Sequence, residues 1–151
     1  MSLKIKHKNP KLDLMVIGWI EHIALPALGL GDIRCKIDTG ARTSALHADN
    51  ITKFQKDGED WVRCDVRLKA AGKLTQIEAP IYDMRKIKNT GGVPQERIVI
   101  RTPVVLGGRK WSISVSLTDR SNMKFPMIVG RSALKNQNIA VHTRLANLTR
   151  T

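Results

Sequence analysis

Short runs of alternating polar and apolar residues, each bounded by turn-forming residues, constrain the fold of this chain more than any other feature. The clearest run spans residues 61–68, where Val, Cys, Val and Leu occupy every second position. A period of two places these side chains on one face of a β-strand and the polar ones on the other. Polar turns at 56–60 and 71–73 separate this strand from its neighbours.

Comparable runs recur from residue 14 to residue 142. We expect strand, turn and strand within 14–30, and further strands at 32–37, 44–51, 61–68, 74–82, 85–88, 96–105, 110–117, 127–130 and 139–142. The pattern predicts a short helix only at 131–136. Many short strands with little amphipathic helix predict a small, mainly β domain, either a barrel or a sandwich of antiparallel strands.

The length and charge of the chain limit its organisation and its partners. Its 151 residues fit a basic N-terminal arm at 1–13 followed by a single domain at 14–151. Hydrophobic residues make up 42% of the chain, which is enough to bury a core. The formal net charge of +13 attracts polyanions such as nucleic acid, anionic membrane or acidic protein segments.

The sequence also bears on compartment and thiol chemistry. No apolar run approaches the length of a membrane span, and the N-terminus lacks the apolar middle of a signal peptide. We therefore expect a cytoplasmic protein, or a periplasmic one if a leader has been removed. Cys35 and Cys64 lie in predicted strands and are expected to be buried free thiols, with a disulfide between them as the open alternative.

The predicted strand at 32–37 runs directly into Asp38, Thr39 and Gly40. Such a tripeptide makes a good turn, and by itself it is a weak motif. It is also what an aspartic protease requires, because a carboxylate at a strand end must be held beside a second carboxylate with which it shares one proton. Such a site also needs a later apolar segment ending in glycine to pack under the loop, and residues 126–131, Pro-Met-Ile-Val-Gly-Arg, provide one.

Together these two motifs resemble the retropepsin family of aspartic proteases. The longer segments KIDTGARTSALHA, RKIKNTGG with QERIVI, and SLTDRSNMKFPMIVGRSAL are more similar to a bacterial branch of that fold, often labelled ATP-dependent zinc protease. The resemblance covers residues 18–141, nearly the whole chain. It implies a retropepsin-like closed β-barrel with one short C-terminal helix.

The resemblance also implies a role for each motif residue. Asp38 would be the catalytic aspartate, Thr39 would hydrogen-bond across the dyad, and Gly40 would allow close backbone approach. The residues expected to support this loop are Ala41, Ile128, Val129 and Gly130. Because the chain carries one Asp-Thr-Gly, a complete dyad requires a homodimer in which Asp38 of each copy meets at a two-fold axis.

Residues 85–100 are a candidate substrate flap. Gly91 and Gly92 lie near the tip of this predicted hairpin, and a lid that closes over a substrate is drawn from segments of low local stability. The same pattern fits an ordinary surface hairpin equally well.

Two arginines distinguish this chain from the retroviral members of the family. Those members carry acidic residues after Asp-Thr-Gly-Ala, whereas this chain has Arg42, and Arg131 must therefore find another partner, such as Asp119 or a different carboxylate. Arginine binds carboxylates with two hydrogen bonds, so Arg42 and Arg131 favour an acidic substrate, with poly-glutamate as the extreme case. In the alternative interpretation Arg42 is structural and the positive charge is solvated surface.

No cofactor or metal site is expected from the spacing of ligand residues. The ligand-capable side chains are His7, His22, His47, His142, Cys35 and Cys64, and none forms a His-Glu-x-x-His or Cys-x-x-Cys pattern. The chain also lacks a Gly-x-x-x-x-Gly-Lys-Ser/Thr phosphate loop.

The sequence therefore predicts an aspartic-type peptidase that pairs with a second copy of itself and hydrolyses peptide bonds, with an acidic peptide or protein as its substrate. It predicts no membrane partner. The alternative is a non-catalytic basic binding module for an acidic protein or RNA on the same fold. Against RNA, the chain has few aromatic residues for stacking on bases and no known recognition motif.

Overall fold

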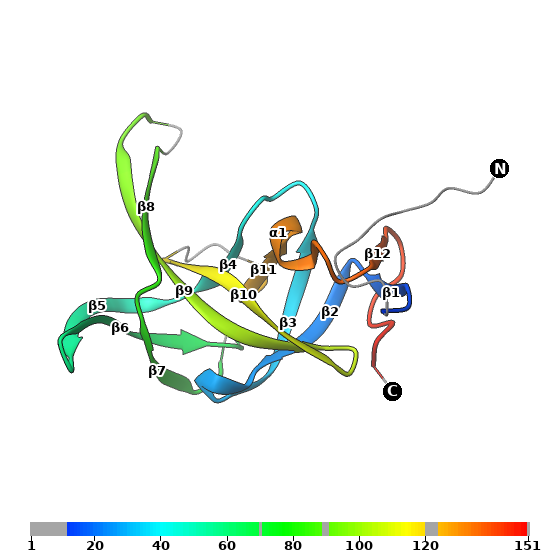
Figure 1. Ribbon diagram of the computed structural model, residues 1–151, viewed down its shortest axis with the longest axis horizontal. Helices are drawn as coiled ribbons and strands as arrows, with labels where there is room; N and C mark the ends of the chain where they lie inside the picture. Colours follow the sequence, from blue (N-terminus) through cyan, green and yellow to red (C-terminus); the bar gives the residue numbers. More distant parts are fainter. Residues whose placement is uncertain (1–11, 70, 89–90, 120–123, 151) are drawn as a thin grey trace.

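The computed structural model of the chain describes residues 12–69, 71–88, 91–119 and 124–150 (Figure 1). Within these residues, six strands close into a barrel in the order β10–β4–β11–β3–β2–β9, with β9 pairing back onto β10. Their bounds are Ile20–Leu25 for β2, Leu30–Asp38 for β3, Ser44–His47 for β4, Pro94–Leu106 for β9, Arg109–Thr118 for β10 and Met127–Gly130 for β11. The mainly β fold and the closed barrel predicted from sequence are confirmed.

Alternation along the strands builds the barrel core. In β3, Ile33, Cys35 and Ile37 are at most 5% exposed, while the residues between them face outward. The other barrel strands contribute aliphatic side chains in the same way, so the core contains almost no aromatic rings: Leu25, Leu46, Ile100, Leu106, Ile113, Val115, Met127 and Val129 are all buried. Burying this apolar surface is the main force that holds the barrel together.

Two further groups of strands extend the barrel on one side. β8 (Asp83–Lys88) pairs antiparallel with the first part of β9, and together they form a long hairpin that projects from the body at the upper left of Figure 1. β5 (Asp49–Lys56), β6 (Glu59–Arg67) and β7 (Leu74–Pro80) form a separate three-stranded sheet. Lys53 Nζ lies 3.3 Å from Glu96 Oε1, which joins that sheet to the hairpin.

The first and last strands pair on the opposite side of the barrel. β1 (Met15–Gly18) and β12 (Ile139–His142) pair in parallel and, among the described residues, form a ribbon of their own (Figure 1). Beside this ribbon the fully buried Glu21 carboxylate accepts hydrogen bonds from the backbone N–H groups of Gly18, Leu148 and Thr149 and from the Thr149 hydroxyl. Glu21 thereby anchors the C-terminal segment to the barrel.

Three details refine the sequence expectations. The predicted strand at 44–51 is two strands, because β4 ends at His47 and β5 begins at Asp49. The predicted helix at 131–136 is the shorter α1 (Arg131–Leu134), since Lys135 leaves helical geometry and Asn136 takes a φ of 81°. A short 3₁₀ turn, η1 (Pro26–Leu28), links β2 to β3.

Cys35 and Cys64 are both buried and free, as expected, and burial raises the pKa of each thiol to about 12. No described helix is long and apolar enough to cross a membrane. Most of the predicted arm at 1–13 lies outside the described residues. The carbonyl groups of Leu12 and Asp13, which are described, accept hydrogen bonds from Asn138 and Arg109.

Candidate active site

Asp38 ends β3 and begins the turn that leads to β4. Because Ile33, Cys35 and Ile37 point into the core, Asp38 falls on the opposite face of the strand and is only half-buried. Its Oδ1 atom accepts the N–H of Gly40 at 3.1 Å, and its carbonyl oxygen accepts the N–H of Ala41 at 3.1 Å. The turn therefore fixes the carboxylate at the strand end through its own backbone.

β11 supports this turn from the side. It runs parallel to β3 and pairs Val129 with Ile37 and Gly130 with Asp38. The N–H of Gly130 donates to the hydroxyl of the fully buried Ser44 at 3.0 Å. A Cβ on Gly130 would lie 2.7 Å from the carbonyl carbon of Thr43, closer than real Cβ atoms approach other atoms. Only glycine at position 130 allows the two segments to pack in this way.

The beginning of α1 holds the other side of the same loop. The N–H groups of Arg131 and Ser132 donate to the carbonyl oxygens of Ala41 and Arg42 at 2.9 and 3.1 Å. The Arg131 side chain donates to the Gly40 carbonyl at 3.2 Å, with a longer contact of 3.4 Å to the carbonyl of Thr39. The sequence leaves the partner of Arg131 open between Asp119 and another carboxylate, and in the structure its guanidinium contacts these backbone carbonyls.

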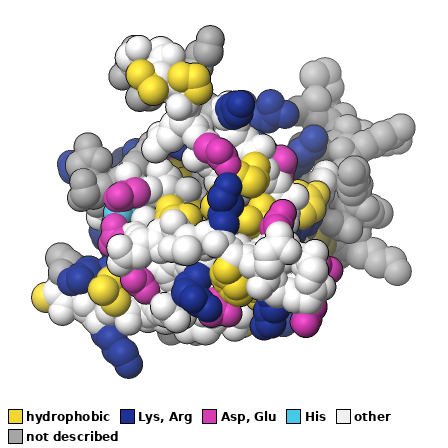
Figure 2. Space-filling view, turned by 90° about the vertical axis from the view of Figure 1, so that its left-hand side faces the viewer, with side chains coloured by type: hydrophobic (Ala, Val, Ile, Leu, Met, Phe, Trp, Pro, Cys, Tyr) yellow, Lys and Arg dark blue, Asp and Glu magenta, His cyan; other side chains and the backbone are white. Residues whose placement is uncertain are grey.

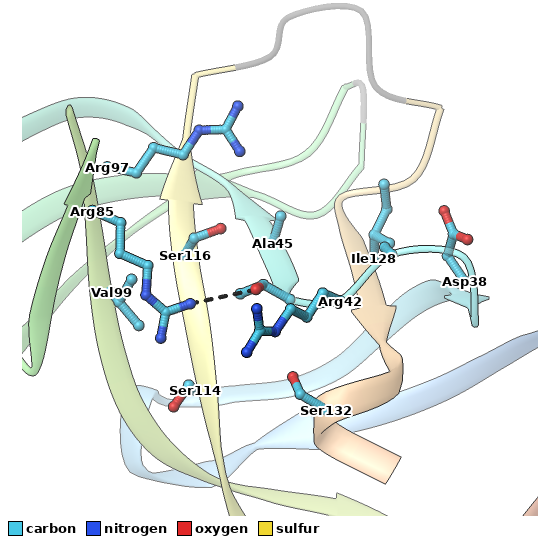
Figure 3. A pocket seen from close by; sticks show the side chains of 12 residues that line it. Asp38, Arg42, Ala45, Arg85, Arg97, Val99, Ser114, Ser116, Ile128 and Ser132 are labelled. Carbon is cyan, nitrogen blue, oxygen red and sulfur yellow. Dashed lines mark hydrogen bonds between the residues drawn. The ribbon is translucent and has the colours of Figure 1, made fainter. Parts of the chain in front are cut away.

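A cavity of about 770 Å³ opens beside Asp38. It lies between the loop that follows Asp38 and the base of the β8–β9 hairpin (Figure 3). Its charged lining consists of one acid, Asp38, and three arginines, Arg42, Arg85 and Arg97. The remaining lining residues are small or aliphatic: Ala41, Thr43, Ala45, Val99, Ser114, Ser116, Ile128 and Ser132. A cavity of this size with several cations on its wall can take a peptide segment that carries negative charge.

The β8–β9 hairpin overhangs this cavity. Arg85 Nη1 donates to the Thr43 hydroxyl at 3.4 Å, a contact drawn in Figure 3 that bridges the hairpin to the loop after Asp38. Gly92, near the tip, is exposed and takes a φ of 76°. Gly91 is exposed as well, while residues 89 and 90 between them and β8 lie outside the described residues. The hairpin is therefore placed where a flap would act, and the substrate-binding role predicted for the two glycines stays a prediction.

Thr39 faces away from the cavity. It is exposed and lines a second, smaller hollow of about 400 Å³ together with Arg131, Leu134, Lys135 and residues 139–143 of β12 and its end: Ile139, Val141 and Thr143. The Asp-Thr-Gly turn and the β1–β12 ribbon thus share one side of the molecule.

A separate cluster of ligand-capable side chains lies at the far end of β4. One ligand atom each of His47, Asp49 and Asp119 lies within 4.8 Å of the others, and His47 Nε2 is 3.6 Å from Asp49 Oδ1. Sequence spacing did not predict this group, because Asp119 follows β10, which pairs with β4. The donor set is of a kind that can hold a divalent cation. It does not include Asp38.

On the face shown in Figure 2, the positively charged side chains do not form a single patch. Figure 2 shows Lys and Arg side chains scattered among Asp and Glu there, with the hairpin projecting at the top. Some surface arginines have acidic partners, such as Arg63, whose Nε lies 2.9 Å from Glu78 Oε1 on the neighbouring strand. The arginines that line the cavity are therefore more informative about function than the net charge.

Sequence reasoning missed Arg85 and Arg97, which the fold brings to the cavity. The sequence does place both arginines in the predicted hairpin at 85–100, which is already a candidate flap over the site. Their position over the cavity depends on the register of that hairpin and on its angle to the barrel, and neither follows from the pattern of apolar residues.

Comparison with known proteins gives a family match over most of the chain. The sequence profile of the RimB-like family, described as retropepsin-like aspartic endopeptidase RimB, matches residues 16–149. The crystal structure of a Legionella pneumophila protein of unknown function superposes with a TM-score of 0.78 at 30% sequence identity, covering 91% of this chain and 100% of that one.

The curated relatives are longer proteins, and their name describes a ligase rather than an endopeptidase. The chain is 40% identical over 126 residues to a probable alpha-L-glutamate ligase of Desulfotalea psychrophila, covering 82% of this chain and 27% of the relative. It is 37% identical over 126 residues to a probable alpha-L-glutamate ligase of Shewanella pealeana, covering 82% of this chain and 28% of the relative. The chain therefore spans about a quarter of the length of these relatives.

Proposed function

The chain belongs to the RimB-like family of retropepsin-like aspartic endopeptidases, and we propose that it hydrolyses peptide bonds in acidic segments as a homodimer with a shared aspartate dyad. The observation that carries this proposal is the position of Asp38. Its carboxylate is held at a strand end by the Gly40 N–H and borders a large cavity whose other charged residues are arginines.

The homodimer follows from what one chain lacks. The mechanism requires two close carboxylates, and within the described residues Asp38 is the only acid that lines the cavity. The side of the molecule that carries Thr39 also carries the β1–β12 ribbon, whose outer edges have no described partner strand. Exposed apolar side chains lie on and around this ribbon: Leu14, Val16, Leu145 and Leu148. Unpaired strand edges and exposed apolar residues both favour association with another chain.

The proposed chemistry divides the work between the two copies of Asp38. In the proposed dimer the two Asp38 carboxylates lie side by side and share one proton, because ionising both would bring two negative charges together. The ionised copy takes a proton from a water molecule, and the protonated copy donates a hydrogen bond to the scissile carbonyl. The water then attacks the carbonyl carbon, and transfer of a proton to the amide nitrogen lets the carbon–nitrogen bond break.

The fold supplies the rigidity that this chemistry needs. The loop around Asp38 is fixed by the Gly40 N–H, by Gly130 packed against Thr43, and by the Arg131 guanidinium on the loop carbonyls. A carboxylate held in place by its surroundings loses little entropy when it reaches the reactive geometry. Thr39 is exposed in the single chain, and in the proposed dimer it contacts the second copy.

Two observations favour an acidic substrate. Arg42, Arg85 and Arg97 line the cavity beside Asp38, and guanidinium groups bind carboxylates with strong, directional hydrogen bonds. The curated relatives are named probable alpha-L-glutamate ligases, a name that points to glutamate as the amino acid concerned. We therefore favour a peptide that ends in a run of glutamates as the substrate.

The test is hydrolysis of such a peptide by the wild-type chain and by Asp38→Asn, followed by mass spectrometry over acidic to neutral pH. Asparagine keeps the shape of the side chain and an oxygen for the Gly40 N–H, so the variant should fold. Cleavage that the variant loses and that EDTA leaves unchanged is the expected result. Equal cleavage by both proteins would refute an aspartic mechanism. Peptide binding by both without cleavage would favour the non-catalytic binding module.

A further inference from the structure

We propose that Arg85 and Arg97, on the β8–β9 hairpin, form a carboxylate-binding subsite that selects acidic side chains of the peptide. This inference rests on the proposed function and deepens it, because it assigns specificity to a pair of residues outside the Asp-Thr-Gly motif and its supporting strand. The occupant is a glutamate or aspartate side chain of an extended peptide that enters the cavity beside Asp38.

The two arginines are direct cross-strand partners. In the antiparallel register of β8 and β9, Arg85 lies opposite Arg97, and the next pair on the same face is Asp83 with Val99. Like charges that are directly opposite on an antiparallel pair destabilise it. Arg42 adds a third guanidinium to the same cavity. The cavity wall therefore carries several positive charges, and an anion bound in the cavity would reduce the repulsion among them.

The described acids of the hairpin, Asp83 and Glu96, do not line the cavity. Glu96 lies next to Arg97 in sequence, but its carboxylate points to the other face and contacts Lys53 at 3.3 Å. Asp83 Oδ2 contacts Arg85 Nε at 3.1 Å, and both side chains of this pair are more than 40% exposed. Ion pairs so exposed contribute little to stability, so a substrate carboxylate can replace Asp83 at low cost.

The positions of the guanidinium groups suit more than one carboxylate. In Figure 3 the side chains of Arg85 and Arg97 diverge from the hairpin, and Ser116 lies between them. In an extended peptide every second side chain points the same way, so a run of acidic residues presents carboxylates at regular intervals. Separate cations along one wall match such a run better than they match a single charge.

The contact between Arg85 and the Thr43 hydroxyl links this subsite to the catalytic loop. Thr43 also packs against Gly130, the residue opposite Asp38 in β11. An acidic side chain that binds Arg85 therefore engages the hairpin and lies next to the loop that positions the nucleophilic water.

The experiment measures affinity apart from catalysis. In the Asp38→Asn background, which cannot cleave, a fluorescent hexaglutamate peptide is titrated and followed by anisotropy. Arg85→Glu/Arg97→Glu should weaken binding by a hundredfold or so, about tenfold for each arginine. The matched control is Lys110→Glu/Arg144→Glu, which changes the net charge equally at exposed positions outside the cavity and should weaken binding less than about threefold.

Three further measurements keep the inference separate from the proposed function. Arg85→Gln/Arg97→Gln, which adds no acid, should lose affinity as well, and thermal unfolding should show that it is folded. With Asp38 intact, Arg85→Glu/Arg97→Glu should lose more of its cleavage rate on an acidic peptide than on a neutral peptide, and equal losses on both would mean that the pair does not select for charge. The same variant should also bind hexalysine better than the wild-type chain does.

Several outcomes would overturn the subsite. Equal losses in the cavity variant and the surface control would mean that only the overall charge attracts the peptide. If the arginine substitutions left the cleavage of acidic peptides unchanged, the peptidase activity would be supported and the proposed subsite would be wrong. If single-stranded RNA competed with hexaglutamate and lost affinity in the same variants, the cavity would be a general polyanion site and the acidic-peptide assignment would be wrong.

Discussion

Replacing Gly130 by alanine should damage the catalytic loop without removing any group that takes part in the chemistry. A Cβ at this position would lie 2.7 Å from the Thr43 carbonyl carbon and 2.9 Å from both the Arg42 carbonyl carbon and the Thr43 nitrogen. All three are backbone atoms, which cannot rotate away as a side chain would. Either β11 or the loop that follows Asp38 must shift by several tenths of an ångström.

The size of the effect follows from this geometry. Forcing one extra methyl group into a tightly packed site costs about 1–3 kcal/mol. In a chain of this length each kcal/mol lowers the melting temperature by about 2–4 °C, so we expect a decrease of roughly 2–12 °C. Activity should fall further than stability, because a displacement of about 1 Å at a reacting group can reduce the rate by about a hundredfold.

Thermal unfolding and peptide hydrolysis measured on the same preparations check this prediction. Gly31→Ala is the matched control, since Gly31 lies in β3, has no atom within 4 Å of the position that a Cβ would take and has no left-handed φ. That change should leave activity intact and stability unchanged or slightly higher. If Gly130→Ala were as active and as stable as Gly31→Ala, the packing of β11 against the loop would not position Asp38.

Three other perturbations test the scaffold. Glu21→Ala should lower the free energy of unfolding by roughly 2–5 kcal/mol in urea titrations, because four donated hydrogen bonds lose their buried acceptor; a change under about 0.5 kcal/mol would argue against the anchor. Arg131→Ala should reduce hydrolysis while lowering the melting temperature by only a few degrees, as its bonds to the loop carbonyls are exposed; unaltered hydrolysis would remove Arg131 from the site. Cys35 and Cys64 should resist thiol reagents at pH 8 unless the protein unfolds. Because burial raises the pKa of each from 9.0 to about 12, the unfolded state loses thiol protons first, so stability should decline as pH rises from 9 toward 12; rapid labelling of the folded protein would contradict this.

The sequence predicts the strands well because each covers one face of a single core. The alternation in β3 and β6 and the apolar run of β11 arise because their apolar side chains are buried, and such a pattern can be recognised within a short stretch of sequence. The meeting of Asp38 with Gly130 is expected from the resemblance of the two motifs to retropepsins, and the alternation of apolar residues alone does not predict it. The boundary between β4 and β5 is harder to predict, because a change of sheet within one extended segment leaves the alternation unbroken.

The remainder of the site depends on contacts between distant segments. The partners of Arg131 are backbone carbonyls, which carry no residue-specific signal in a sequence. Arg85 and Arg97 reach the cavity through the register and bend of a hairpin. His47 and Asp119 meet because β4 and β10 are neighbours in the barrel, although 71 residues separate them along the chain. Each of these contacts requires the topology as well as the pattern.

Mixing wild-type chains with Asp38→Asn chains tests the shared dyad most directly. Equal amounts are denatured together, refolded so that subunits pair at random, and assayed for peptide hydrolysis at a fixed total concentration. If each active site needs Asp38 from both copies, about a quarter of the dimers are active, and the mixture should have about a quarter of the wild-type activity. Activity near one half would mean that each chain works alone, and it would contradict the shared dyad.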